Sequence, residues 1–426
     1  MRKDESMLDP KFIRENPEIV REAIRQKRVK FDVEKFFSSD EIYRKLLKKT
    51  EEARAEHNAK SEAVAKADPA QRKTLIAEVQ EGKAVLQKLE EDLRSAEAEW
   101  KALLFLIPNP PAPDVKEGKD DSENEVVRTV GTPPKFDFEP KDYIAIAEQW
   151  NIIDTARAGK VSGTRFGYLQ GEAAMLEMAL VFFAFDTLRK EGFVPVIPPV
   201  MINETPMRAM GYMDRGGDEI YKIEGENLYL VGTSEQSIGP MHMNEVFEER
   251  DLPRRYVGFS SCFRKEAGAS GKDTRGILRV HQFNKVEMFS YTTPEQSDAE
   301  HAFILSLEEK LVGALDLPYH VLGICSGDLG DPAARKYDIE CWVPSQGKYR
   351  ETHSCSSCTD FQARRLNIKY RSEDGLKYVH TLNGTAFATG RMLIAILENF
   401  QQADGTVRVP EVLVPYCGFR IIGEKK

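Results

Sequence analysis

The chain has 426 residues, 41% of them hydrophobic and 30% charged, and its net charge is −9. This length favours two domains, and the acidic balance excludes a protein coated with basic charge for nucleic acid, while a local basic patch is compatible with it. No apolar run approaches the ~20 residues of a membrane span, and six scattered cysteines favour a reducing compartment, so we expect a cytoplasmic protein without a membrane segment.

The first helix is predicted to begin at Asn16-Pro17-Glu18, which has the order of an N-cap, a first-turn proline and an acid. Its end is basic and is compatible with either a solvated face or an RNA contact, through Arg21, Arg25, Lys27, Arg28 and Lys30. Residues 1–105 carry 23 Lys and Arg against 22 Asp and Glu, so the negative charge lies in the remainder. A polyanion is therefore better placed against the N-terminal part.

A heptad repeat predicts a helix from Gln71 to Phe105, about 50 Å long. Its apolar positions recur alternately four and three residues apart, at Leu75, Val79, Gly82, Leu86, Leu89, Leu93, Ala96, Trp100 and Leu103. The expected partner is a helix from about Asp40 to Lys66 that reverses at Asp68-Pro69 and has a weaker seam of Ile42, Leu46, Ala53 and Val64. The pair forms an antiparallel coiled-coil arm over about residues 40–104. An oligomerisation coiled coil is the alternative.

The segment Ile107–Asp114 contains four prolines and cannot lie inside a helix. The acidic, glycine-containing segment Lys116–Val126 extends the break. We therefore predict a boundary here, between an N-terminal domain of residues 1–112 and a second domain of residues 113–426.

The second domain is predicted to combine helices with an antiparallel sheet. Gly171–Lys190 is typical of an apolar helix, and a strand at Phe193–Ile197 follows it and ends at Pro198-Pro199. Further strand-like runs fit an antiparallel sheet better than alternating βαβ units, at Tyr229–Gly232, Arg255–Phe259 and Arg279–Phe289. The expected fold class of the chain is α+β.

The stretch Phe263–Phe289 is predicted to form two strands joined by a Gly-rich loop. Residues two apart on a strand share a face, so Arg264 and Glu266 point the same way on the first strand. On the second strand one face carries Arg279, His281, Phe283, Lys285 and Glu287, and the other carries Leu278, Val280, Val286 and Met288. The Phe283 ring beside Arg and Glu is a platform for a purine base, with a guanidinium for a phosphate.

Two other interpretations of this stretch are an amphipathic surface hairpin and a P-loop. A P-loop is excluded because only two residues separate Gly268 from Gly271 and because Asp273, rather than Ser or Thr, follows Lys272. The surface hairpin stays open on these residues alone.

A second informative arginine lies in a predicted helix, Ala386–Phe400, whose side chains are apolar nearly all round. Such a helix is expected to be buried, and a buried arginine needs an anion. For Arg391 the two candidates are a bound phosphate and a carboxylate such as Glu398.

Three segments resemble the motifs of class II aminoacyl-tRNA synthetases, in the form typical of seryl-tRNA synthetases. Arg264-x-Glu266, the loop and RVHQF-x-KVE look like motif 2, and NGTAFATGRMLIAILENFQQADG looks like motif 3. The helix and strand from Gly171 resemble motif 1, which in that class builds the dimer interface. The resemblance runs over nearly the whole chain from Met7, and no HxGH or KMSKS stretch of class I is present.

The resemblance implies a class II catalytic domain, built on an antiparallel sheet flanked by helices, and an arm that grips the tRNA. The implied reaction is that of a serine–tRNA ligase, which forms seryl-adenylate and pyrophosphate from serine and ATP and then charges serine tRNA. It further implies a homodimer and Mg²⁺. Whether selenocysteine tRNA is a further substrate stays open.

The resemblance also implies roles for individual residues, with Arg264 and Arg391 as the catalytic pair at the α- and γ-phosphates. The implied ATP-binding residues are Arg264, Lys265, Glu266, Arg279, Val280, Phe283, Glu351, Thr352, His353, Ser354 and Arg391. The implied serine-binding residues are Thr233, Ser234, Glu235, Arg264, Glu287, Asn383 and Thr385. Glu351 and Ser354 supply hard oxygen atoms suited to Mg²⁺.

The chain departs from the usual family pattern at several of these positions. His353 and Thr352 replace residues of an E-V-S-S segment, Ser234 replaces an alanine, and Ala386-Phe387 replaces Gly-Leu, so the fine shape of the pocket stays open. Cys355-x-x-Cys358, with His353 and Cys341 near it in sequence, is a weak zinc pattern because it is a single pair.

Two competing functions are a ligase that activates a small amino acid for another acceptor and a non-catalytic relative kept for binding. The intact arm argues against the first. The presence of Arg264, Glu266, Phe283, Glu287, Glu351 and Arg391 argues against the second.

Overall fold

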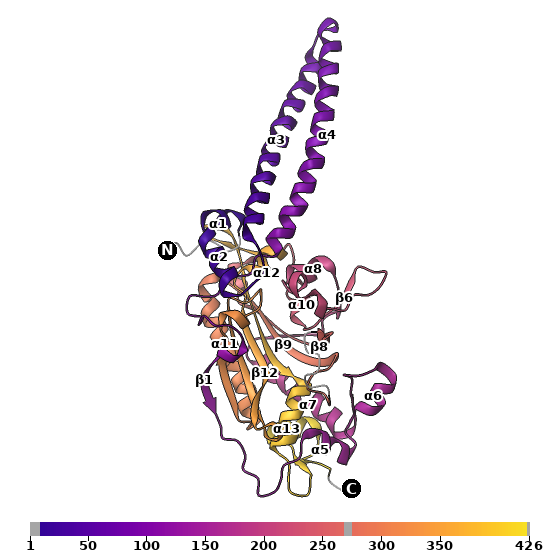
Figure 1. Cartoon of the computed structure of the whole chain (residues 1–426), viewed down its shortest axis with the longest axis vertical. Helices are drawn as coiled ribbons and strands as arrows, with labels where there is room; N and C mark the ends of the chain where they lie inside the picture. The colour runs from indigo at the N-terminus through magenta and orange to yellow at the C-terminus, as the bar shows by residue number, and fades with distance from the viewer. Residues whose placement is uncertain (1–8, 268–274, 424–426) are drawn as a thin grey trace. The chain divides into compact units, whose positions relative to one another are not determined.

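The computed structural model describes residues 9–267 and 275–423 (Figure 1). These residues form two compact units. The helical unit comprises Pro10–Arg25 and Val29–Pro108, and the sheet unit comprises Gln26–Arg28 and the chain from Asn109 onward. The division at Asn109 falls inside the proline-rich segment. The glycine loop with Gly268, Gly271, Lys272 and Asp273 lies outside the described residues.

The helical unit contains four helices: α1 (Pro10–Glu15), α2 (Pro17–Gln26), α3 (Val33–Lys66) and α4 (Pro69–Phe105). Helices α3 and α4 run side by side in opposite directions (Figure 1). The chain reverses at Asp68, whose Oδ1 accepts hydrogen bonds from the N–H groups of Ala70 and Gln71 and so caps α4. The predicted start near Asp40 is wrong. Helix α3 begins at Val33, because the Asp32 side chain accepts from the Glu34 N–H there.

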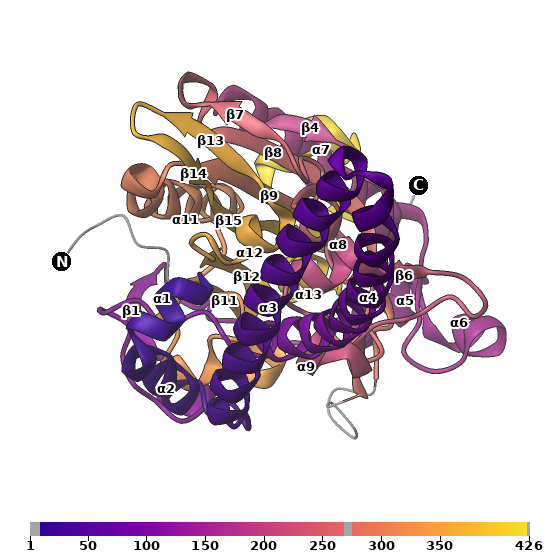
Figure 2. The same cartoon turned by 90° about the horizontal axis from the view of Figure 1, so that it is seen from above.

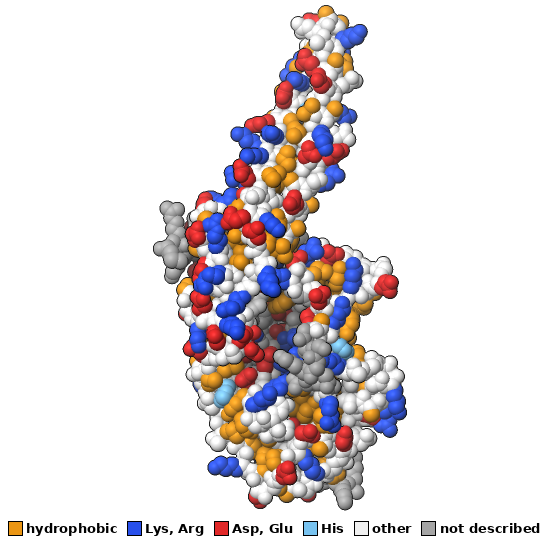
Figure 3. Space-filling model, in the orientation of Figure 1, with side chains coloured by type: hydrophobic (Ala, Val, Ile, Leu, Met, Phe, Trp, Pro, Cys, Tyr) orange, Lys and Arg blue, Asp and Glu red, His pale blue; other side chains and the backbone are white. Residues whose placement is uncertain are grey.

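The hairpin has a thin core. The predicted seam positions of α4 are partly buried, and no residue of α4 is fully buried. Hydrophobic side chains run between the two helices, with Lys, Arg, Asp and Glu interspersed around them (Figure 3). The prediction that Ile42 lies in the seam is wrong, because its side chain is 55% exposed. Its neighbour Tyr43 faces α4 and stacks on Trp100 with ring centroids 4.8 Å apart.

Trp100 makes both an aromatic and a polar contact across this hairpin. Besides stacking on Tyr43, its Nε1 donates to Asp40 Oδ1 (3.0 Å), which also accepts from Arg14 (3.0 Å). We expect Trp100→Ala to lower the free energy of unfolding of the helical unit by about 2–3 kcal/mol, since stacking, burial and a hydrogen bond are lost together. Hydrogen exchange of α3 and α4 amides measures this loss. The control Val85→Ala, at a side chain that is 54% exposed, is expected to change it by less than ~0.5 kcal/mol, and equal losses in both variants would contradict the prediction.

The sheet unit is built on one eight-stranded sheet. In spatial order its strands are β1 (Glu125–Val130), β10 (Tyr319–Gly323), β11 (Arg335–Val343), β12 (Lys348–Ser357), β15 (His380–Ala388), β9 (Gln282–Thr292), β8 (Arg254–Phe263) and β4 (Val194–Val196). All neighbours are antiparallel except β4 and β8. The predicted α+β fold with an antiparallel sheet is confirmed.

Three helices cover one face of this sheet (Figures 1 and 2): α7 (Gly171–Lys190), α11 (Ser297–Ala314) and α13 (Thr389–Asn399). Helix α7 has the bounds that the sequence predicts. The main core cluster joins these helices to alternate strand residues such as Val286 and Met288 of β9. Because side chains alternate between faces, Lys285 and Glu287 point to the opposite face.

The opposite face is only partly covered. Helices α8 (Glu204–Ala209), α10 (Glu235–Ile238) and α12 (Phe361–Leu366) pack there around Phe289 and Tyr291 of β9. The remaining elements are α5 (Tyr143–Trp150), α6 (Thr155–Ser162), α9 (Met213–Gly216), α14 (Val414–Cys417), β2 (Ile153–Asp154), β3 (Tyr168–Leu169), β5 (Met201–Asn203), β6 (Leu228–Leu230), β7 (Val246–Glu248), β13 (Lys369–Ser372), β14 (Gly375–Tyr378), β16 (Val407–Arg408) and β17 (Ile421–Ile422). Within the described residues, no helix is both long enough and apolar enough to cross a membrane.

Three further predicted elements have wrong bounds. Strand β8 ends at Phe263, so Arg264 and Glu266 lie beyond it, and Glu266 has a left-handed φ of 51° that ends the extended conformation. Residues 279–281 precede β9. The helix predicted from Ala386 begins only at Thr389, because β15 continues to pair with β9 as far as Ala388 and this pairing overrides helix propensity.

Candidate active site

A cavity of about 750 Å³ opens on the partly covered face of the sheet unit. It is lined by β8 and β9, by β12 and β15, by the first turn of α13 and by residues 329–333. Figure 3 shows charged side chains of both signs in the hollow on this side. Most of the residues that the sequence singles out therefore meet in one place.

One side of the cavity carries an aromatic ring beside a guanidinium group. Arg264 lies over the Phe283 ring, with its Cζ 5.2 Å from the ring centroid, and its Nε donates to the Gly232 carbonyl oxygen (3.3 Å). Arg279 donates to Glu266 Oε2 (3.2 Å). The predicted combination of a flat ring, arginines and a glutamate is present, although only Phe283 comes from a strand.

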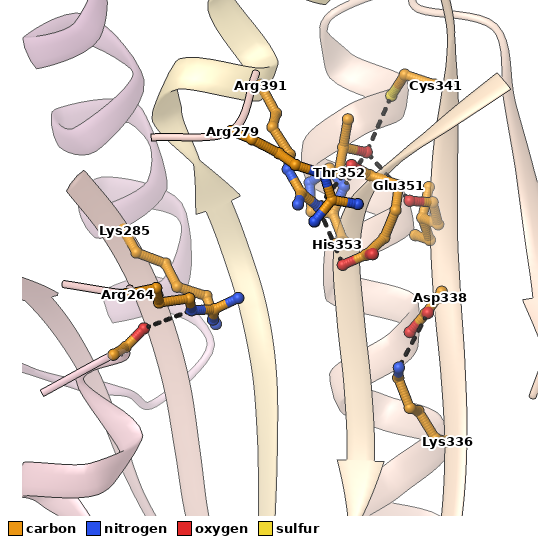
Figure 4. A network of polar contacts seen from close by, with 12 residues as sticks. Arg264, Arg279, Lys285, Lys336, Asp338, Cys341, Glu351, Thr352, His353 and Arg391 are labelled. Atoms are coloured by element: carbon orange, nitrogen blue, oxygen red, sulfur yellow. Dashed lines mark hydrogen bonds and ion pairs between the residues drawn. The ribbon is translucent and has the colours of Figure 1, made fainter. Parts of the chain in front are cut away.

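Arg391 and Glu351 form a second charged centre (Figure 4). Arg391 Nη1 lies 3.1 Å from Glu351 Oε1 and also donates to the Glu351 carbonyl oxygen (3.0 Å). The prediction that Arg391 is buried is wrong, because α13 starts at Thr389 and Arg391 stands in its first turn at the cavity edge, with a side chain 25% exposed. Its pairing with Glu398 is also wrong, since that carboxylate accepts from the Tyr143 and Ser345 N–H groups.

The charges around Glu351 keep it ionised. Enclosure by the cavity alone raises a carboxyl pKa, but the positive charges of Arg391 and Lys336 lower the pKa of Glu351 to about 2. Asp338 pairs with Lys336 (3.1 Å), yet burial and the negative charge of Glu351 raise the pKa of Asp338 to about 6. Figure 4 shows Glu351 and the Asp338–Lys336 pair on neighbouring strands, β12 and β11. This region therefore holds one fully ionised carboxylate beside cationic groups.

The cavity lining also contains two buried glutamates, Glu235 and Glu287. Glu287 Oε2 lies 2.6 Å from Lys285 Nζ, which also donates to Thr233 Oγ1 (3.2 Å). Burial raises the pKa of Glu287, while Lys285 opposes this change. Thr385 donates a hydrogen bond that favours the charged form of Glu287.

A chain of hydrogen bonds orients Glu235. Its carboxylate accepts from Tyr212 Oη (3.0 Å) and from Gln362 Nε2 (2.8 Å), and Thr381 Oγ1 in turn donates to Gln362 Oε1 (2.7 Å). Burial and the negative charge of Glu287 raise the pKa of Glu235 to about 7. Because the pocket holds two carboxyl groups and only one lysine, it favours binding of a cation.

Most of the residues in the three predicted sets line the cavity, and three do not. Ser234 is buried and hydrogen bonds to Ser260 (2.8 Å). Lys265 is exposed and lies over the Tyr221 ring. His353 is buried against Phe387 on the helix-covered side, because its neighbour Ser354 on β12 points to the cavity.

Several cavity residues have no role in the sequence interpretation. That interpretation placed Lys285 on one strand face with Phe283 and Glu287 but gave it no function. Tyr212, Gln362 and Lys336 carry no such signal, because each reaches the site from an element distant in sequence.

Among the described residues, no group of three or more His, Cys, Asp or Glu side chains is arranged to hold a metal ion. Cys355 packs in the main core, whereas Cys358 lines the cavity. All six cysteines are free.

Known proteins share both units of this chain. Residues 7–111 match the family described as "Seryl-tRNA synthetase N-terminal domain", and residues 221–400 match "tRNA synthetase class II core domain (G, H, P, S and T)". The serine–tRNA ligase of Treponema denticola is 44% identical over 98% of this chain and 100% of its own length. The seryl-tRNA synthetase of Pyrococcus horikoshii, solved with ATP, superposes with a TM-score of 0.89 at 42% identity, over 98% of this chain and 99% of its own. The cytoplasmic serine–tRNA ligase of Naegleria fowleri, solved with AMP, gives a TM-score of 0.83 at 36% identity over 96% of both chains.

Proposed function

The chain belongs to the seryl-tRNA synthetase family, and we propose that its cavity forms seryl-adenylate and then transfers the seryl group to serine tRNA. The activity is ATP-dependent serine–tRNA ligation. The observation that carries the proposal is the meeting, in one cavity, of a phosphate-binding side with Arg264 and Arg391 and a cation-binding side with Glu235 and Glu287. An amino acid has an ammonium for the second side and a carboxylate to direct at the nucleotide.

The ATP side uses stacking and charge. Phe283 offers its ring to the adenine, Glu266 contacts the base, Arg264 binds the α-phosphate and Arg391 binds the γ-phosphate. The proposed ATP set is Arg264, Glu266, Arg279, Val280, Phe283, Glu351, Thr352, Ser354 and Arg391, all of which line the cavity. Lys265 and His353 are not part of the proposed ATP set, since neither lines the cavity.

The serine side holds both ends of the amino acid. Glu235, fixed by Tyr212 and Gln362, accepts hydrogen bonds from the serine ammonium. Glu287 accepts from the serine hydroxyl, and Thr385 donates to it. The proposed set is Thr233, Glu235, Arg264, Glu287, Asn383 and Thr385. In this position the serine carboxylate oxygen attacks the α-phosphorus and pyrophosphate leaves, while the positive charge of Arg264 stabilises the transition state.

Magnesium fits the Glu351–Ser354 pair. Mg²⁺ commonly takes one or two carboxylate or hydroxyl oxygens from the protein and the rest from phosphates and water. Glu351 suits this role because its low pKa keeps it ionised. When bound, the ion would neutralise negative charge on the phosphates.

A homodimer is supported by an exposed apolar surface on the motif 1 elements. Met175, Met178 and Phe182 stand on one face of α7, with exposed fractions of 49%, 38% and 55%, and Val194 and Ile197 lie exposed around β4 at 55% and 81%. Helix α7 contacts β4, and exposed apolar side chains gathered on neighbouring elements mark an interface. We also propose that the helical unit holds the tRNA. The proposed domains are residues 1–112 and 113–426, and the proposed compartment is the cytoplasm.

The test of the whole proposal is serine-dependent ATP–pyrophosphate exchange followed by charging of purified serine tRNA. Both reactions are expected. Exchange without charging of any tRNA would support a ligase for another acceptor, and absence of both would support a non-catalytic binding protein. Selenocysteine tRNA is tested in the same assay.

The two phosphate-facing arginines are expected to matter for activation. A hydrogen bond to a charged group contributes about 1.5–3 kcal/mol, so Arg264→Ala and Arg391→Ala are each expected to slow exchange at least ~10-fold. The matched control is Arg420→Ala, since Arg420 is exposed and pairs with Glu411 at the surface. Exchange within twofold of the parent in folded Arg264→Ala or Arg391→Ala protein would remove that residue from the phosphate site.

A further inference from the structure

One wall of the cavity contributes no residue to the proposed ATP and serine sets. It consists of Leu329–Ala333, called here the 329–333 wall, which lines the cavity just before β11. Arg215 and Lys336 line the cavity with it, and Arg215 pairs with Asp331 (Nη2–Oδ1 2.5 Å). Arg215 and Lys336, which pairs with Asp338, belong to neither the ATP set nor the serine set.

The wall is held by a buried lysine from far away in the sequence. Lys27 is 8% exposed, and its Nζ donates to the carbonyl oxygens of Gly330 (2.7 Å), Asp331 (3.1 Å) and Ala333 (2.6 Å). An ammonium has three N–H donors, and these three acceptors use all of them. Burying a lysine is costly unless its donors are satisfied, so this arrangement fixes the backbone of the wall.

A second buried residue holds the same wall. Asn109 is fully buried, and its backbone N–H donates to the Asp331 carbonyl oxygen (2.9 Å). Its Nδ2 donates to the carbonyl oxygens of Pro332 (2.8 Å) and Cys358 (2.9 Å). Through Asn109 the wall is thus also connected to Cys358, another residue that lines the cavity.

Lys27 and Asn109 have a common place in the chain. Lys27 lies in the short segment Gln26–Arg28 of the sheet unit, whose flanking residues on both sides belong to the helical unit, and Asn109 is the first residue after that unit. The Gln26 carbonyl oxygen also accepts from Ser326 Oγ (3.0 Å), close before the wall. The chain leaves the helical unit at Gln26 and again at Asn109. Both segments form hydrogen bonds with the 329–333 wall or with Ser326, close before it.

The tRNA is the one substrate that the proposed ATP and serine sets leave out. We propose that Lys27 and Asn109 are positioning residues for the transfer step, fixing the 329–333 wall against which the 3′-terminal nucleotide of the tRNA is placed. This inference rests on the proposed function. In the step itself, the ribose hydroxyl oxygen bonds to the seryl carbonyl carbon and the bond from that carbon to the phosphate oxygen breaks. AMP leaves with the electron pair, and the hydroxyl proton passes to its phosphate.

The experiment compares both half-reactions in Lys27→Met and Asn109→Ala proteins. We expect exchange, and the KM values for ATP and serine, to stay within twofold of the parent. Single-turnover transfer from preformed seryl-adenylate to serine tRNA is expected to slow at least ~10-fold, because the loss of hydrogen bonds that fix a reacting geometry lowers the rate more than substrate binding. The affinity for tRNA, measured by filter binding, is expected to stay unchanged. Lys310→Met, at an exposed lysine that pairs with Glu191, is the matched control.

Other outcomes overturn the inference. Equal losses in exchange and transfer would mean that the wall serves the whole cavity, and unchanged transfer would mean that it serves neither step. If Lys27→Met fails to fold, Lys27→Arg and Asn109→Ala carry the test, with melting temperatures measured alongside. Failure of the parent protein to exchange or to charge would instead overturn the proposed function, so the two failures are distinguishable.

Discussion

Serine is expected to be activated at least ~10⁴-fold more efficiently than alanine, as is typical of sites that hydrogen bond a substrate hydroxyl. The reason is the pocket around Glu287, which is 1% exposed and pairs with Lys285 at 2.6 Å. Alanine would fill this pocket without a hydroxyl, so the buried groups of Glu287 and Thr385 would lose their partner and no water could replace it cheaply. The measurement is kcat/KM for amino-acid-dependent pyrophosphate exchange with serine, alanine and glycine.

A matched variant locates the source of the selectivity. Thr385→Ala is expected to lower serine activation about 10-fold, which corresponds to one hydrogen bond of about 1.4 kcal/mol, and to leave alanine activation nearly unchanged. The ratio between the two amino acids should fall by the same factor. Comparable exchange with serine, alanine and glycine in the parent protein would instead indicate a ligase for another small amino acid.

Elements set by local patterns could be predicted from the sequence. Helix α7 has the predicted bounds, and the alternation on β9 places Lys285 and Glu287 opposite Val286 and Met288 as expected. The seam of α4 follows its heptad repeat. In α3 the repeat is weaker. Tyr43 rather than Ile42 faces α4 because its ring stacks on Trp100 across the hairpin, and periodicity does not report such a contact.

The errors have a common physical cause, which is contact between distant segments. Residues 386–388 look helical alone, but they pair with β9. The helix therefore begins three residues later than predicted, and Arg391 stands in its first turn at the edge of the cavity. For the site, motif resemblance identified residues just after β8, on β9, β12 and β15, and on α13. Gln362 stayed undetected, and the expectation that Lys27 lies on a solvated basic face is wrong, because its side chain is buried. Neither residue lies in a motif, and their partners are far away in sequence, at Glu235 and Gly330.

Shortening the helical hairpin is expected to separate the two half-reactions completely. Every residue that lines the cavity belongs to the sheet unit, so replacing Arg44–Glu99 by a short Gly/Ser loop should leave serine-dependent exchange within about twofold of the parent. The replacement keeps Trp100, which donates to Asp40 and stacks on Tyr43, so the base of the hairpin retains its packing. Charging of serine tRNA is expected to fall at least ~100-fold, because the loss of several phosphate contacts removes a large part of nucleic-acid affinity.

The control for this deletion changes charge without changing length. Lys48 and Lys49 are exposed on α3, so a Lys48→Glu, Lys49→Glu protein is expected to keep exchange and to weaken tRNA binding, with a shallower dependence of binding on salt than the parent shows. Normal charging by the shortened protein would mean that the hairpin does not hold the tRNA. Sedimentation decides what it does instead: loss of the dimer in the shortened protein would identify the hairpin as an oligomerisation coiled coil, whereas a retained dimer leaves the exposed apolar face of α7 as the interface.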